Sequence, residues 1–335
     1  MKRDSTIVSP PAAPGAVEGG PSRRRLLAGV AFAAFTLGVS VLLARRLTHT
    51  SWPLERAHMG LVSGAVALYF TSYVLRALGW QKLFPVAGRP GRGRCLTACG
   101  AAAASGVILP FRLDYVVKVS TLRRMPGVKL GLEAIVFSII SLGLVDAVAF
   151  LPLSISATAT SSAGFRGPLI LVVLFGVGAC GILVAGPRLA TVPFVARRGR
   201  LSRLASRVAD HPRGTTRDAI LAWLFLLGCW TTRASGSMLL LAALGAGFSP
   251  VLALVVLCLA AAASLIPVTS GGVIANVGAT AAVLLALGVH RQEAINFGLA
   301  SGLLLCTTAA AAAVVGLASS LALSRRPRAL ARAEA

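Results

Sequence analysis

The sequence has few charged and few aromatic residues. Only 13% of its 335 residues are charged and 6% are aromatic, whereas 56% are hydrophobic and the mean hydropathy is +0.82. Because a water-facing surface needs far more charge than this, the composition excludes a soluble domain. The low aromatic content and the lack of alternating ten-residue segments also argue against a β-barrel. We therefore predict an all-α polytopic membrane protein.

Residues with metal-binding or catalytic chemistry are scarce as well. The six cysteines form no CxxC motif, and the four histidines show no HExxH spacing. No nucleophile elbow and no acidic pair on one helix face occur either. The sequence thus predicts no enzyme, no metal site and no cofactor. The cysteines are expected to be small packing residues.

Acidic residues number only 10, against 33 Lys and Arg. The only lysines are Lys2, Lys82, Lys118 and Lys129. We interpret this arginine bias, together with abundant Ala and Gly, as GC-rich bacterial coding. The net charge of +23 therefore does not by itself indicate a nucleic-acid partner, and the expected partners are membrane lipids with anionic headgroups.

Six apolar stretches approach or exceed the length of about 20 helical residues that crosses a membrane. They are residues 26–44, 57–80, 130–153, 168–185, 218–247 and 294–323. Two further stretches are interrupted by a proline, Pro110 in one and Pro267 in the other. Their pieces are short for separate crossings, so we predict two re-entrant helical hairpins. Irregular backbone at such a turn must line protein or a water-filled cavity, because lipid cannot satisfy its amide groups.

This arrangement places both termini in the cytoplasm. It puts 24 of the 33 Lys and Arg in cytoplasmic segments and five in outer segments, which agrees with the positive-inside rule. We expect a disordered cytoplasmic tail over 1–22, a single transmembrane domain over 23–323 and a basic cytoplasmic tail over 324–335. The expected location is the bacterial cytoplasmic membrane, with the chain crossing it several times.

An offset of 157 residues aligns the two hairpins and the helices that precede them. Arg76-Ala77-Leu78-Gly79 aligns with Arg233-Ala234-Ser235-Gly236, and Pro110 aligns with Pro267. In the predicted topology the two copies, about 57–153 and 218–323, run in opposite directions. Inverted repeats with broken helices near the midplane are typical of secondary transporters, in which the breaks form the binding site.

Charged and glycine-rich positions inside the apolar stretches are the candidate substrate-binding residues. A buried charge is costly and needs a partner or a cavity. Asp114 and Lys118 are one helical turn apart and can form a structural pair or contact substrate, and Asp146 can neutralise an arginine of the cavity. Arg76 can instead extend to the interface. The candidates are Arg76, Arg112, Asp114, Lys118, Arg233, Thr269, Ser270, Gly271, Gly272 and Asn276.

These positions resemble motifs of the lysylphosphatidylglycerol synthase transmembrane region family. Residues 75–80 resemble the end of a family helix, 109–118 its first hairpin and 267–273 its second hairpin, and the resemblance spans about 26–323. It implies a flippase-like membrane module. The chain departs from the family motifs at Gly79, Asp114, Tyr115, Lys118, Ser270, Ile274 and Val277, which is typical of a diverged member. The family's aminoacyl-transferring domain is not expected here, so lysyl transfer is not predicted.

The function that we predict is movement of an anionic lipid or lipid-linked substrate across the membrane. Arg76, Arg112 and Arg233 would offset the desolvation of its headgroup. One alternative is a non-transporting subunit that anchors or regulates a cell-envelope enzyme through the arginine-rich loop 188–217. Another is a membrane transferase that depends on an essential carboxylate. A homo-oligomer or an envelope-enzyme partner is compatible with the sequence.

Overall fold

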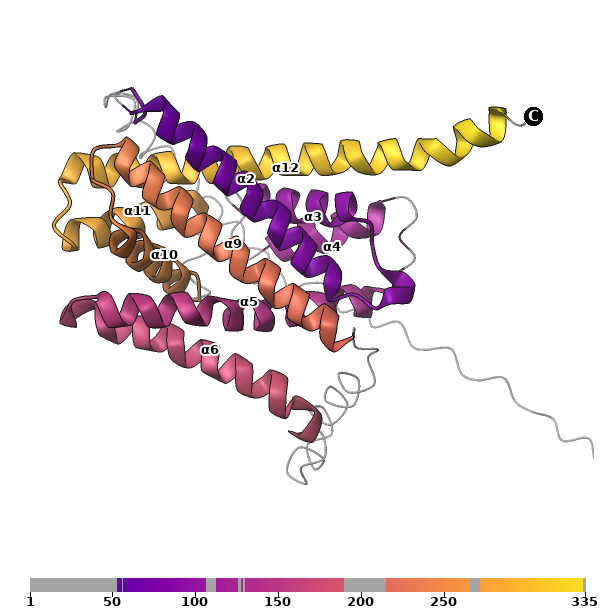
Figure 1. The fold of residues 1–335 in the computed structure, drawn as a ribbon, viewed down its shortest axis with the longest axis horizontal. Helices are drawn as coiled ribbons and strands as arrows, with labels where there is room; N and C mark the ends of the chain where they lie inside the picture. Colours follow the sequence, from indigo (N-terminus) through magenta and orange to yellow (C-terminus); the bar gives the residue numbers. More distant parts are fainter. Residues whose placement is uncertain are drawn as a thin grey trace, which may run out of the picture. The chain divides into compact units, whose positions relative to one another are not determined.

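Every regular element of the described residues is a helix (Figure 1), which confirms the predicted all-α class. The structure, a computed structural model, describes residues 53–55, 57–106, 113–125, 128, 130–189, 215–265 and 272–333, all within the unit Thr50–Ala335. The helices are α2 (Met59–Lys82), the 3₁₀ helix η1 (Val86–Gly88), α3 (Arg92–Gly106), α4 (Asp114–Arg124), α5 (Leu132–Thr160), α6 (Ala163–Leu189), α9 (Thr216–Ala243), α10 (Pro250–Leu265), α11 (Gly272–Ala286) and α12 (Arg291–Ala333).

Five of these helices are long and apolar enough to cross a membrane. They are α2, α5, α9, most of α6 (Gly164–Ala185) and most of α12 (Arg291–Ala322). They correspond to five of the six predicted spans, so the chain is a polytopic membrane protein. The remaining predicted span, 26–44, and the predicted tail over 1–22 lie outside the described residues. Residues 324–333, predicted as a tail, continue helix α12.

Helix α5 extends about two turns beyond its predicted end because its last residues are polar but helical. Ser156 donates from Oγ to the Pro152 carbonyl at 2.9 Å, and Thr158 donates from Oγ1 to the Ser154 carbonyl at 2.7 Å. Ser and Thr that bond to the preceding turn satisfy their own hydroxyl groups within the helix. Hydropathy alone therefore ended this span too early.

Helices α2 and α9 pack side by side in opposite directions (Figure 1). The backbone N–H of His58, just before α2, donates to the carbonyl of Ala243 at the end of α9, at 3.1 Å. At the other end, Asp218 in the first turn of α9 forms salt bridges with Lys82 at 3.2 Å and with Arg89 at 2.8 Å. The antiparallel pair is therefore held at both ends.

A glycine from each helix permits the close approach of α2 and α9. A Cβ atom added at Gly79 would lie 3.1 Å from Leu226 Cγ, and one added at Gly236 would lie 2.9 Å from Tyr69 Cε1. A larger side chain at either position would push the helices apart. The two glycines are 157 residues apart, and so are the two residues that they meet. The contact thus repeats at the offset that aligns the sequence with itself.

The other helix contacts also come in pairs related by this offset. Helix α3 packs on α12 as α10 packs on α5, and α2 packs on α12 as α9 packs on α5. Likewise, α3 contacts α4 as α10 contacts α11, and α4 contacts α5 as α11 contacts α12. Helix α6, which has no counterpart in this scheme, packs on α5 and α10.

Helices α3 and α4 come from the apolar stretch that Pro110 interrupts, and we call them a broken pair; α10 and α11, from the stretch that Pro267 interrupts, are the other. The broken pair α3–α4 begins and ends in one hydrophobic cluster. Cys95, near the start of α3, and Leu122, near the end of α4, lie in a cluster with Trp80 and Phe84. Trp80 is at the end of α2, so both outer ends of the pair return to that end of the helix bundle.

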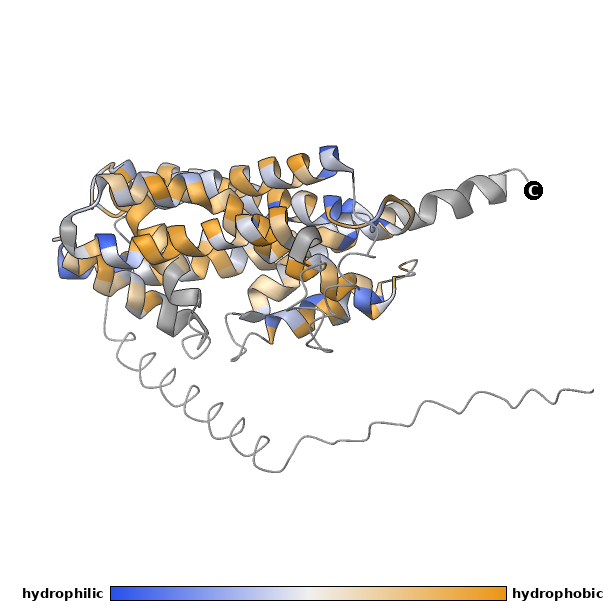
Figure 2. Ribbon diagram, turned by 90° about the horizontal axis from the view of Figure 1, so that it is seen from below, coloured by the Kyte–Doolittle hydropathy of each residue, from blue (hydrophilic) through white to orange (hydrophobic). Residues whose placement is uncertain are grey.

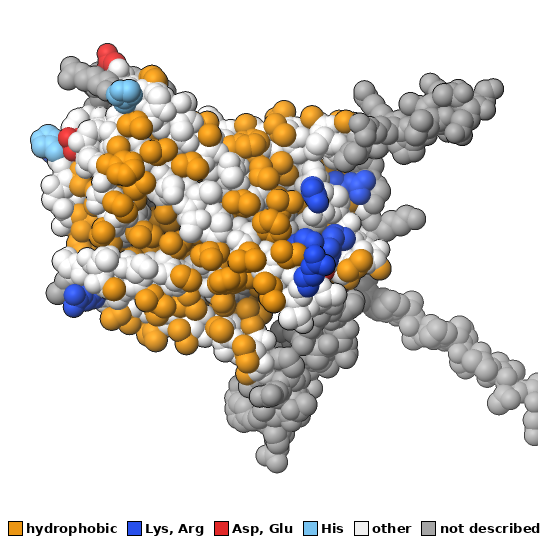
Figure 3. Space-filling view, in the orientation of Figure 1, with side chains coloured by type: hydrophobic (Ala, Val, Ile, Leu, Met, Phe, Trp, Pro, Cys, Tyr) orange, Lys and Arg blue, Asp and Glu red, His pale blue; other side chains and the backbone are white. Residues whose placement is uncertain are grey.

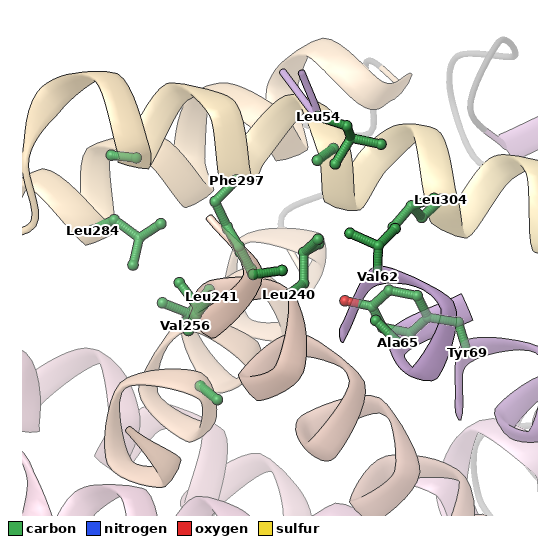
Figure 4. Packing of buried hydrophobic residues seen from close by; sticks show 14 residues of the cluster. Leu54, Val62, Ala65, Tyr69, Leu240, Leu241, Val256, Leu284, Phe297 and Leu304 are labelled. Atoms are coloured by element: carbon green, nitrogen blue, oxygen red, sulfur yellow. The ribbon is translucent and has the colours of Figure 1, made fainter. Parts of the chain in front are cut away.

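The broken pair α10–α11 returns to the opposite end of α2. Ala253, near the start of α10, and Leu284, near the end of α11, share a cluster with Val62 and Leu240. Figure 4 shows side chains from these helices converging around Phe297. Val62 is near the start of α2 and Leu240 near the end of α9, so the two broken pairs occupy opposite ends of the α2–α9 pair.

The surface separates into an apolar middle and charged ends. Hydrophobic residues follow the helices along most of their length (Figure 2). Most of the Lys and Arg side chains visible in Figure 3 gather at the end where α2 terminates, whereas most of the acidic surface and the histidine side chains in that view lie at the opposite end. An apolar belt between charged ends is typical of helices embedded in a bilayer.

Candidate functional site

An ion pair joins α2 to α5 in the interior of the helix bundle. Arg76 donates from Nη2 to Asp146 Oδ2 at 2.7 Å, and Trp230 of α9 donates its indole N–H to Oδ1 of the same carboxylate at 2.8 Å. Each carboxylate oxygen therefore accepts a hydrogen bond, so neither acceptor is left unsatisfied in an apolar setting. The prediction that Asp146 neutralises an arginine is confirmed. Arg76 is directed at this carboxylate and is partly exposed.

Arg233 of α9 lies between two aromatic rings. Its guanidinium carbon is 5.1 Å from the ring centroid of Tyr73 and 5.5 Å from that of Trp230, both within the range of cation–π attraction. Its Nε donates to Ser72 Oγ at 3.2 Å. No salt bridge joins Arg233 to any carboxylate of the described residues. Its charge is compensated there only by rings and a hydroxyl group.

Lys118 of α4 is a buried cation, with 5% of its surface exposed. Its Nζ lies 4.1 Å from the centroid of a Trp80 ring, a close cation–π contact. The pair with Asp114 that the helical spacing allows does not form, since no salt bridge between these two described residues is present. Packing of α4 against the end of α2 directs Lys118 to the ring instead.

Two cavities adjoin these side chains. The larger, which we call the first-half chamber, has a volume of about 580 Å³, and its polar lining comprises Tyr73, Arg76, Asp114, Tyr115, Lys118, Asp146, Trp230 and Arg233. The smaller, the second-half chamber, has a volume of about 300 Å³, and its polar lining comprises Tyr69, Tyr73, Trp230, Arg233, Ser237, Thr280 and Ser301. Volumes of this size accommodate small ligands or a lipid headgroup.

The mouth of the first-half chamber is apolar. Three of its lining residues lie at the outer surface of the helix bundle, namely Tyr115 at 39% exposure, Ile140 at 50% and Phe175 at 51%. They come from α4, α5 and α6. Because apolar side chains at the surface of a membrane-spanning bundle are expected to face lipid, this part of the chamber wall borders the lipid-facing surface of the described helices.

The structure brings four of the ten predicted site residues together. Arg76, Asp114, Lys118 and Arg233 all line the first-half chamber, although they come from three different helices. Gly272 is the first residue of α11, and Asn276 lies in its second turn. The other four predicted site residues, Arg112, Thr269, Ser270 and Gly271, lie outside the described residues.

Two aromatic residues at the centre of the site are not among the predicted site residues. Tyr73 and Trp230 line both chambers and flank Arg233. A signal for them was present in the sequence, because the 157-residue offset that pairs the two arginines also places Tyr73 on Trp230. An aromatic residue three positions before a half-buried arginine recurs in both copies.

The described part of the chain offers no metal site. No group of three or more His, Cys, Asp or Glu side chains lies close enough there to hold an ion. The polar groups that line the chambers are instead cations, aromatic rings, hydroxyl groups and two carboxylates. Cationic and hydroxyl donors suit an anionic ligand oxygen.

Five apolar membrane-spanning helices around charged chambers define a polytopic α-helical membrane protein. Residues 25–305 match the model of a family described as the lysylphosphatidylglycerol synthase TM region. Because the match covers well over half of the sequence, the chain belongs to this family, as its motifs predicted. No curated protein and no solved structure matches the chain.

Proposed function

We propose that this protein moves an anionic lipid, or a lipid-linked substrate with an anionic headgroup, across the bacterial cytoplasmic membrane. The observation that carries the proposal is the first-half chamber, which combines a cationic interior with an apolar mouth. A lipid has the matching two parts, a charged headgroup and hydrocarbon chains. The headgroup would occupy the chamber while the chains remain in the bilayer.

The charges of the first-half chamber favour an anionic ligand. Three cations line it, Arg76, Lys118 and Arg233, against the carboxylates of Asp114 and Asp146. An uncompensated charge costs several kcal/mol to bring to the centre of a bilayer, on the order of 2.5–3.5 kcal/mol on insertion scales. Fixed cations would offset that cost for an anionic headgroup and raise it for a cationic one.

The same proposal includes a topology with both termini in the cytoplasm. The basic end of the α2–α9 pair, marked by Lys82 and Arg89, would face the cytoplasm, and the end with the histidine side chains and most of the visible acidic surface would face outward (Figure 3). The broken pairs α3–α4 and α10–α11 would then be re-entrant hairpins that enter from opposite sides.

An inverted repeat over about 57–153 and 218–323 is also part of the proposal. The antiparallel packing of α2 on α9, the paired glycine contacts and the paired helix contacts support it. Two copies related by a two-fold axis in the membrane plane would give one chamber to each side of the membrane, as alternating-access transporters require.

The proposed function assigns no catalytic step to any residue and needs no cofactor. Its test is lipid translocation by the full chain in proteoliposomes that contain traces of fluorescent lipids. The panel comprises labelled phosphatidylglycerol, a labelled polyprenyl phosphate and labelled zwitterionic phosphatidylcholine. A membrane-impermeant quencher reports the label that remains in the outer leaflet.

The proposal predicts that the protein speeds exchange of at least one of the anionic lipids over empty vesicles, with a smaller effect on phosphatidylcholine. Which anionic lipid responds distinguishes a phospholipid from a polyprenyl-linked substrate. Rates equal to those of empty vesicles for the whole anionic panel would contradict the proposal, provided that the reconstituted protein is monodisperse before and after the assay.

A further inference from the structure

The two chambers meet at one layer of side chains. Tyr73, Trp230 and Arg233 line both chambers, together with the small residues Ala103 and Ala261. The first three carry nearly all the bulk of the shared wall. Among the described residues, a ligand that passes from one chamber to the other would therefore pass these side chains.

Each aromatic ring of this layer is tied to a different neighbouring helix. The Tyr73 hydroxyl group donates to the Leu305 carbonyl of α12 at 3.1 Å, and the Trp230 indole N–H donates to Asp146 of α5 at 2.8 Å. Trp230 also packs against Phe150, with ring centroids 4.5 Å apart. The rings are thus fixed across the space between the chambers, because rotation of either breaks a hydrogen bond that the apolar surroundings do not replace.

The two arginines of the repeat differ in their counter-charge. Arg76 pairs with Asp146, whereas the position 157 residues after Asp146 is occupied by Leu303. The repeat therefore provides Arg233 with no carboxylate at the equivalent position. Its guanidinium group stays between the rings of Tyr73 and Trp230, where it borders both chambers.

From these contacts, we infer that Tyr73, Trp230 and Arg233 form the gate between the two chambers. The two rings close the passage, and Arg233 is the cation that meets an anionic group arriving from either side. That an anionic group passes the gate rests on the proposed function, whereas the barrier between the chambers does not. A charge-assisted hydrogen bond to an anion is stronger than the ring contacts that hold Arg233 at rest, so an arriving anion can draw it away from the rings.

The gate can be tested by the accessibility of thiols on its two sides. The six native cysteines are replaced, and one reporter is placed in each chamber. Gly143→Cys reports on the first-half chamber, where an added Cβ meets no atom within 4 Å, and Ser301→Cys reports on the second-half chamber. Proteoliposomes are treated with a membrane-impermeant thiosulfonate from one side at a time.

With the gate intact, each reporter should react from one side only, and the two sides should be opposite. In the Tyr73→Ala/Trp230→Ala variant both reporters should react from both sides. The matched control is Ile140→Ala/Phe175→Ala, which removes two apolar side chains from the first-half chamber but leaves the shared layer intact. That control should keep the one-sided reaction.

Two results would overturn the gate. One is reaction of either reporter from both sides while Tyr73 and Trp230 are intact, and the other is unchanged sidedness in the double variant. If the double variant fails to give a monodisperse protein, Trp230→Ala alone, which opens the layer while leaving Tyr73 in place, replaces it with the same expectations.

The outcome is independent of the lipid assay. One-sided reporters that lose their sidedness in the double variant, in a protein that moves no lipid, would leave the gate standing and remove the proposed function. Lipid movement, together with sidedness that the double variant does not change, would leave the proposed function standing and remove the gate.

Discussion

Single side chains in this protein hold charge where hydrocarbon would exclude it. Arg76 is neutralised by Asp146, but Lys118 and Arg233 have only aromatic rings and a hydroxyl group as close partners among the described residues. A cation–π contact returns about 0.5–2 kcal/mol, which is less than the cost of burying an ammonium or guanidinium group. Cations kept at such a cost are expected to serve ligand binding.

The Arg76–Asp146 pair is expected to contribute to stability. Asp146→Asn removes the charge that compensates Arg76 and weakens the acceptor for Trp230, so it should destabilise the protein by about 2 kcal/mol, less than a fully buried pair would lose because Arg76 is partly exposed. The loss should appear as a lower melting temperature in detergent. Glu293→Gln, a substitution near the start of α12, is the control and should melt like the parent. Equal melting temperatures for Asp146→Asn and the parent would contradict this role.

Lys118, in contrast to the Arg76–Asp146 pair, is expected to lower the stability of the protein while it supports transport. Lys118→Met keeps the length of the side chain but removes a buried charge, so it should raise stability by about 1 kcal/mol. The same substitution should slow translocation of anionic lipid, because the chamber loses one of its cations. Melting curves and the proteoliposome assay measure the two effects on one preparation. A lower melting temperature combined with unchanged translocation would show that Lys118 is a structural residue only.

The sequence predicted which charges are exceptional but not all of their partners. The cost of a buried charge singled out Arg76, Asp146 and Arg233 without any coordinates, and the expected neutralisation of an arginine by Asp146 is present. Helical spacing shows only neighbours on the same helix, so it suggested Asp114 for Lys118. The actual contact with Trp80 depends on how α4 packs on α2, which spacing does not specify.

Between helices, contact at backbone distance is the main feature of α3 and α12. A Cβ atom added at Gly100 would lie 2.5 Å from the Ala309 carbonyl oxygen and 2.6 Å from the Ala313 nitrogen. Both atoms belong to the backbone and cannot rotate away. Small residues that let helices approach this closely are a main source of association in membranes, where the hydrophobic effect between helices is absent.

Gly100→Ala is therefore expected to destabilise the protein although alanine favours helices. Helix propensity gains about 1 kcal/mol, but the clash with the α12 backbone should cost more, for a net loss of about 2 kcal/mol. Gly178→Ala on α6, where an added Cβ meets nothing within 4 Å, is the matched control and should be neutral or stabilising. Thermal melting distinguishes the two. A Gly100→Ala variant as stable as the control would mean that α3 and α12 do not pack this tightly.

The helices themselves were largely predictable from hydropathy and length. Five predicted spans correspond to described helices, and both proline-interrupted stretches divide into two helices. The ends were less predictable because polar residues extend α5 to Thr160 by bonding to their own helix. The tight pairs α2–α9 and α3–α12 were not predicted, since the contacts that close them join residues far apart in the sequence.

Across the whole described unit, the helices form two similar sets with unequal charge. Most contacts in one set have a counterpart in the other, but the carboxylate of Asp146 corresponds to Leu303 and the ion pairs of Asp218 correspond to apolar contacts. The helix arrangement is thus repeated, whereas the charged side chains are not. We expect this inequality to set where an anionic headgroup binds along its path, with Arg233 at the centre.

The central claim is that the chambers move anionic lipid because of their cations, and Arg233→Gln tests it most directly. The measurement is the ratio of the translocation rate of labelled phosphatidylglycerol or polyprenyl phosphate to that of labelled phosphatidylcholine, in proteoliposomes of the parent, of Arg233→Gln and of Arg166→Gln as the control outside the chambers. The account predicts that Arg233→Gln lowers this ratio by about tenfold, equivalent to about 1.4 kcal/mol, and that the control does not. An unchanged ratio in folded Arg233→Gln would contradict it.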